Sequence, residues 1–124
     1  MKNKLTIILL VLFTACGDNK NEENATVSGL YVVRLKTEYN MGMDTIEITP
    51  LNNEAGTFNY VRRVGYRRIF NGVLGPMEHK TETSTCLFNQ ETAQLHEQRH
   101  GRIYSLSSDG NQLVFGNSIY KRIQ

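Results

Sequence analysis

The sequence TFNYVRRVGYRRIFNG, residues 57–72, decides the fold. Residues 57–69 are rich in Tyr, Val and Arg, and such a long run of strand-forming residues is typical of one extended strand. The run ends in Asn71-Gly72, the dipeptide most typical of a type I′ hairpin turn, because both central residues of that turn need a positive φ. A long strand that ends in a tight hairpin predicts an antiparallel sheet.

The remaining domain repeats this pattern of alternating segments and short turns. The segments that we expect to form strands are residues 27–35, 44–49, 57–69, 78–88, 94–99, 102–107, 112–115 and 119–123. No window of eleven residues keeps apolar groups at helical spacing. We therefore predict one all-β domain over residues 27–124, an antiparallel meander of about eight strands that forms a small closed or half-closed barrel.

The N-terminus has the order of a secretory signal. Two lysines supply the positive start, residues 5–13 form an apolar run, and small residues precede Cys16. The ending Leu12-Phe13-Thr14-Ala15-Cys16 resembles the lipobox of bacterial lipoproteins. We therefore expect a signal peptide over residues 1–15, lipidation of Cys16 and a flexible tether over residues 16–26. An ordinary signal peptide with a chance cysteine is the alternative.

Removal of the signal changes the charge balance. The whole chain has 14 basic and 12 acidic residues, and two of the basic residues lie in the signal. The mature protein is therefore near neutral, and no nucleic-acid partner is expected. With Cys16 lipidated, Cys86 would be the one free thiol of the mature chain, and we expect it to be a small buried hydrophobe rather than a reactive or metal-binding group.

Several short motifs resemble those of small, uncharacterised lipocalin-like lipoproteins of Gram-negative bacteria. They are Gly29-Leu30-Tyr31, Asp44-Thr45-Ile46, residues 62–69 followed by Asn71-Gly72, Leu113, and residues 120–123. The resemblance implies a β-meander barrel in the cell envelope. The chain is shorter than true lipocalins and lacks the tryptophan of their first-strand Gly-x-Trp motif.

The segment His96-Glu97-Gln98-Arg99-His100 matches the H-E-x-x-H pattern of zinc proteases. That chemistry needs a helix, on which the two histidines share one face. Residues 90–101 offer too few apolar side chains for a helix with a buried stripe. On a strand His96 and His100 would lie about 13 Å apart, too far to share one ion. We therefore predict no metal site and no cofactor, and a zinc-dependent hydrolase built on His96, Glu97 and His100 remains the alternative.

A basic segment is the strongest binding candidate. It comprises Arg62, Arg63, Arg67 and Arg68, with Lys80 expected across the hairpin. Clustered guanidinium groups suit the recognition of carboxylate or phosphate through paired hydrogen bonds. The competing interpretation is a solvated strand face on which the basic residues pair with Glu47, Glu78 and Glu82. Strand alternation would also divide the arginines between two faces.

These observations favour a non-enzymatic binding or accessory lipoprotein. We expect it to be anchored in the cell envelope, at the periplasmic or surface face of the outer membrane, and to hold an anionic ligand or a partner protein. A purely structural envelope protein is a further alternative.

We expect Cys16→Ser to stop processing or to release the protein from the membrane, because several acyl chains are needed for stable attachment. Cell fractionation measures this, with Cys86→Ser as the control that keeps the anchor. Normal processing of Cys16→Ser together with continued membrane attachment would contradict lipidation.

Overall fold

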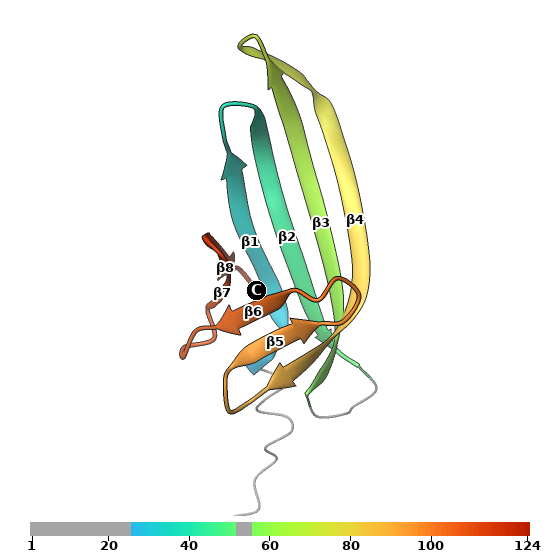
Figure 1. The fold of residues 1–124 in the computed structure, drawn as a ribbon, viewed down its shortest axis with the longest axis vertical. Coiled ribbons are helices and arrows are strands. Elements are labelled where there is room, and N and C mark those ends of the chain that lie inside the picture. Colours follow the sequence, from blue (N-terminus) through green and yellow to red (C-terminus); the bar gives the residue numbers. More distant parts are fainter. Residues whose placement is uncertain (1–25, 52–55) are drawn as a thin grey trace, which may run out of the picture.

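The computed structural model describes residues 26–51 and 56–124, so the predicted signal, Cys16 and most of the tether lie outside the described residues. Eight antiparallel strands in meander order form one closed barrel (Figure 1). The strands are β1 (Gly29–Lys36), β2 (Asn40–Pro50), β3 (Thr57–Phe70), β4 (Val73–Asn89), β5 (Gln94–Glu97), β6 (Ile103–Leu106), β7 (Gln112–Phe115) and β8 (Ser118–Arg122). The predicted all-β meander of about eight strands is confirmed. Over the described ranges, no helix is long and apolar enough to cross a membrane.

The barrel closes through a short pairing of its first and last strands. β1 pairs with β8 at Tyr31↔Arg122 and Val32↔Lys121. The backbone of Leu30 extends this contact, because its N–H donates to Gln124 and its carbonyl accepts from Ile123. The closed arrangement leaves no free edge at this level of the sheet.

The hairpin at Asn71-Gly72 has the predicted geometry. Asn71 and Gly72 both have a positive φ, of 50° and 78°, as a type I′ turn requires. The two strands that pair with β3 are longer than the alternation predicts, since β2 begins at Asn40 and β4 at Val73. Their first residues break the period-two pattern but are paired with β3, whose length sets the length of its neighbours.

Side chains fill the interior of the barrel, as is usual for a barrel of eight strands. The core residues are Val27, Tyr31, Ile46, Ile48, Phe58, Tyr60, Cys86, Leu95, Tyr104, Leu106, Leu113 and Tyr120. The hydroxyls of Tyr60 and Tyr104 lie 2.7 Å apart and form a hydrogen bond. Cys86 has no exposed surface, which confirms its prediction as a buried hydrophobe. Burial, followed by the charge of Glu97, raises the pKa of the Cys86 thiol to about 12.

The first four strands continue well beyond the barrel. β1 pairs with β8 only near its start, and β4 pairs with β5 only over Cys86–Asn89. Residues 33–43 and 64–81 therefore form a four-stranded sheet without barrel partners, which we call the sheet extension (Figure 1). One of its faces, the inner face, continues the interior of the barrel, and the other is the outer face.

Gly42 is required where β2 and β3 approach each other closely. A Cβ at this position would overlap the carbonyl oxygen of Gly65 and lie 2.6 Å from Cα of Tyr66. Both obstacles are backbone atoms of β3, so a rotamer change cannot remove them. Glycine at position 42 therefore lets the extension form its β2–β3 ladder.

We expect Gly42→Ala to lower the free energy of unfolding by about 1–3 kcal/mol, the usual cost of overpacking. Urea denaturation of the full chain measures it. Gly65→Ala is the matched control, because the nearest atoms to its new Cβ belong to the His79 side chain, at 3.4 Å. Equal stability of Gly42→Ala and the unchanged chain would contradict the close approach.

Candidate functional site

The structure divides the predicted basic residues between the two faces of the sheet. Arg62, Arg68 and Lys80 lie on the inner face, where they form ion pairs with carboxylates. Arg63 lies on the outer face and pairs with Glu47 at 3.2 Å. Arg67 is also on the outer face, next to Met41 and Met77 in the register. The five residues therefore do not form one patch. This division agrees with the strand alternation of the sequence.

Arg62 belongs to a polar network at the mouth of the barrel. Its Nε and Nη2 donate to both carboxylate oxygens of Asp44, at 2.8–3.1 Å, and Asp44 is only 2 % exposed. Tyr120 donates a further hydrogen bond of 2.8 Å to Asp44 Oδ2. The hydrogen bond to Asp44 raises the pKa of Arg62. This paired arrangement compensates charges that burial alone would disfavour.

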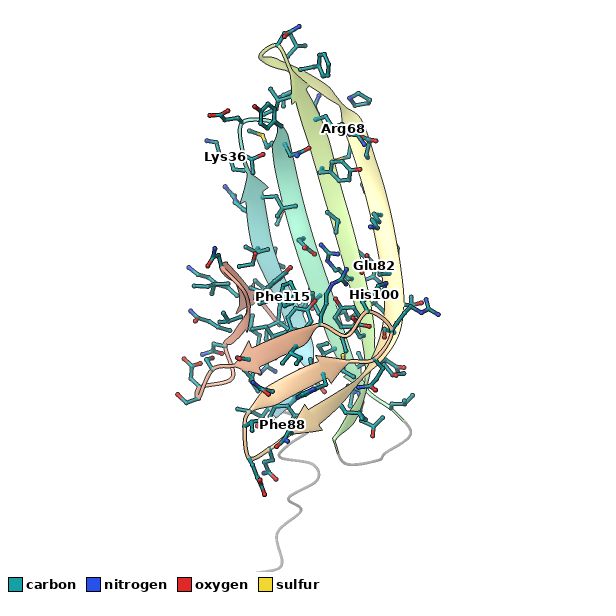
Figure 2. All side chains as sticks on the ribbon, viewed as in Figure 1. Lys36, Arg68, Glu82, Phe88, His100 and Phe115 are labelled. Carbon is teal, nitrogen blue, oxygen red and sulfur yellow. The ribbon has the colours of Figure 1, made fainter. Side chains whose placement is uncertain are left out.

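Glu82 is the second carboxylate of the network. Arg102 donates to its Oε2 at 2.6 Å, and Arg62 Nη1 and Lys80 Nζ each lie 3.4 Å from its Oε1. The hydrogen bond from Arg102 is the main cause that lowers the pKa of Glu82, to about 2. Figure 2 shows Glu82 at the level of the barrel mouth and Arg68 far along the extension.

Asp44, Glu82 and Arg102 were not predicted as site residues. For Asp44, strand alternation is a usable signal in the sequence. Asp44 lies on the same strand face as Ile46 and Ile48, so its carboxylate had to be buried and paired. Glu82 is among the acids that the sequence offers as partners of the basic segment, but the pairing of Arg62 with Asp44 could not be chosen before the register of β2 and β3 was known. The network closes the barrel interior toward the extension and leaves Arg62 engaged within the protein.

The H-E-x-x-H segment forms the end of β5 and a following turn, so the prediction that it is not helical is confirmed. His96 lines a surface hollow with Leu87 and Phe88, whereas Glu97 is 1 % exposed. The two side chains therefore lie on opposite faces of the strand. Within residues 26–51 and 56–124, no group of three His, Cys, Asp or Glu side chains is placed to hold a metal ion.

Glu97 stabilises the turn that joins β5 to β6. Its Oε2 accepts hydrogen bonds from Ser84 Oγ and from the backbone N–H groups of Arg99 and His100, at 2.7–2.8 Å. Burial acts to raise the pKa of Glu97, but these hydrogen bonds outweigh it and lower the pKa. The carboxylate that a zinc hydrolase would use on water is thus committed to the turn.

The far end of the extension combines exposed apolar side chains with a hollow. Tyr39, Phe70 and Val73 are 68–79 % exposed. A hollow of about 410 Å³, which we call the tip hollow, is lined by Tyr39, Asn40, Tyr66, Arg68, Ile69 and Phe70. The N–H of Ile69 donates to the carbonyl of Tyr39 at 2.7 Å, which joins the β1–β2 turn to β3.

Arg68 provides the charge of the tip hollow. Its Nε lies 3.0 Å from Glu78 Oε2, and its side chain remains 66 % exposed. The hydrogen bond to Tyr66 raises the pKa of Arg68. A guanidinium beside aromatic rings suits a carboxylate that arrives with an apolar neighbour.

Comparison with protein-family models, with curated proteins and with solved structures finds no match to this chain.

We expect stability to depend on Glu82 in acid. Its pKa falls from 4.5 to about 2 in the folded protein, so the stability it contributes is present above pH 4.5 and is lost as the pH falls toward 2. Glu82→Gln should lower the free energy of unfolding at neutral pH and reduce its decline between pH 4.5 and 2.

Urea denaturation across this pH range is the measurement. Glu91→Gln is the control, because the Glu91 side chain is exposed, and it should keep the decline of the unchanged chain. If Glu82→Gln lost stability between pH 4.5 and 2 as steeply as the unchanged chain, the charge of Glu82 would not contribute to stability.

Proposed function

We propose that this protein is a non-enzymatic binding or accessory lipoprotein of the cell envelope that holds an acidic partner protein at the tip of the sheet extension. The observation that carries this proposal is the tip hollow, in which Arg68 lies among Tyr39, Tyr66 and Phe70. Aromatic residues and arginine are enriched where proteins bind one another. Attachment through Cys16 and relationship to lipocalin-like lipoproteins are parts of the same proposal, since an eight-stranded barrel alone names no function.

The charge of the extension supports an acidic partner. Residues 33–43 and 64–81 contain five basic and two acidic residues, a net charge of +3. The basic residues are Arg34, Lys36, Arg67, Arg68 and Lys80. The mature chain as a whole is near neutral, so the extension is its basic part. Such a local excess steers an acidic surface toward the tip and fixes its orientation.

The position of the tip supports a role at a distance from the anchor. β1 begins at Gly29 in the barrel and runs into the extension, so the tip lies at the end of the long strands farthest from Gly29 (Figure 1). A lipid on Cys16 would precede that barrel end in the chain. The domain would then be attached through its barrel end, opposite the proposed binding surface, which leaves the tip open to a partner.

Arg62 has a different role in this proposal from the other predicted basic residues. It binds Asp44 and Glu82 within the barrel mouth, so its replacement would leave the buried carboxylate of Asp44 without its ion-pair partner. The binding test therefore leaves Arg62 unchanged and uses the exposed tip. This choice separates lost binding from lost folding.

We expect the double variant Arg68→Ala, Phe70→Ala to capture at least about tenfold less of its partner from solubilised envelopes of the producing bacterium, as removal of a binding hot spot would. Capture by the unchanged chain should also weaken at high salt, because part of the attraction is electrostatic. A photo-crosslinker at position 70 should join the partner, and one at position 103 on the barrel should not.

The matched control is Arg99→Ala, Ile103→Ala, which removes one exposed arginine and one exposed apolar residue from the barrel. It should capture the partner normally. If the tip variant captures every partner as the control does, and position 70 forms no cross-link, the tip is not the binding surface. A purely structural role would then be favoured.

A further inference from the structure

Three methionines and one histidine lie together on the outer face of the sheet extension. Met41 and Met43 are on β2, and Met77 and His79 are on β4. The methionines are 40–52 % exposed, and they are all the methionines of the chain after Met1. Exposed thioethers confined to one face are unusual for a residue type that generally fills cores.

Gly65 of β3 leaves a gap between these side chains. In the register, Met43 and His79 lie on either side of Gly65, so their strands are about 9.6 Å apart, two strand spacings. Glycine weakens the interior of a strand and often marks a place that a ligand approaches. Gly65 does not have a positive φ, so its backbone conformation does not demand glycine.

Two donor atoms already lie over this gap. From the position that a Cβ of Gly65 would take, His79 Nδ1 is 3.4 Å away and Met77 Sδ is 3.7 Å away. These two atoms are therefore at most about 7 Å apart. Met43 faces them from the opposite side of Gly65. A single ion above Gly65 is within reach of all three side chains after rotamer changes alone.

The outer-face rows that border the gap offer sulfur and nitrogen ligands but no carboxylate oxygen. Within residues 26–51 and 56–124, the His79 side chain makes no hydrogen bond or ion pair with another residue, so its ring is available. The neighbouring guanidinium of Arg67 is drawn toward the hairpin, because its Nε donates to the carbonyl of Gly75 at 2.8 Å. The two outer-face rows contain no carboxylate. They consist of Lys36, Met41, Arg67 and Met77, and of Arg34, Met43, Gly65 and His79.

We propose that Met43, Met77 and His79 bind one Cu(I) ion above Gly65. Thioether sulfur is a soft ligand that selects Cu(I), and imidazole nitrogen also suits copper, whereas Mg²⁺ and Ca²⁺ require oxygen ligands. Met41 lies next to Met43 on the same face and completes the sulfur-rich surface. The site is separate from the tip hollow and goes beyond the proposed binding of an acidic partner.

The test is an anaerobic titration of the full chain with Cu(I) against a chromogenic Cu(I) chelator. The chain carries Cys16→Ser, so that no N-terminal thiol competes, while Cys86 is buried. We expect one Cu(I) per chain and X-ray absorption that shows both sulfur and nitrogen ligands. The variant Met43→Leu, Met77→Leu should bind at least about tenfold more weakly, because even loss of an outer-shell partner costs this much.

His96→Gln is the matched control for His79→Gln, since His96 lies on the barrel and lines a different hollow. His79→Gln should weaken Cu(I) binding and His96→Gln should not. Circular dichroism of each variant confirms that the sheet is intact. Absence of Cu(I) uptake, or an affinity that Met43→Leu, Met77→Leu leaves unchanged in a folded chain, would overturn the proposal, and the partner-capture test above would be unaffected.

Discussion

The ion pair between Arg62 and Asp44 stabilises the junction between the barrel and the sheet extension. Arg62 on β3 binds Asp44 on β2 and approaches Glu82 on β4. Tyr120 connects Asp44 to β8, and Arg102 connects Glu82 to the start of β6. On the barrel side of this network the buried side chains are mostly apolar, with Glu97 as a buried carboxylate, and on the other side the strands continue without barrel partners. Loss of either partner would leave a charge in a site with little access to water, which costs far more than the intact pair contributes.

The extension depends on that support because it has no core of its own. A sheet that exposes both faces gains little from apolar burial, and isolated hairpins are marginally stable in water. Its outer edges are the free parts of β1 and β4, which would otherwise invite pairing with other chains. Pro76, which has no N–H to donate, and charged side chains such as Lys80 lie on the β4 edge. These residues oppose unspecific association while the tip stays exposed.

The sequence predicted the features that depend on local pattern. Alternation and turn residues gave the meander and the strand number, and Asn71-Gly72 gave the tight hairpin. The lack of an apolar stripe around His96 and His100 correctly argued against a helix there. What could not be predicted depends on pairing between strands. Three features follow from the register: the pairing of Arg62 with Asp44, the length that β3 imposes on β2 and β4, and the meeting of Met43 with Met77 and His79 over Gly65.

The junction of β1 and β8 has a consequence for how the chain folds. Tyr31 and Arg122, which pair there, are about ninety residues apart in the sequence. Contacts this distant carry the greatest loop-closure entropy and slow the folding of β proteins. The barrel cannot close until its eighth strand has been synthesised, whereas the β2–β3 and β3–β4 hairpins pair neighbouring segments and can form earlier. The kinetics should therefore separate rapid hairpin formation from a slower closure that ties the two ends of the domain together.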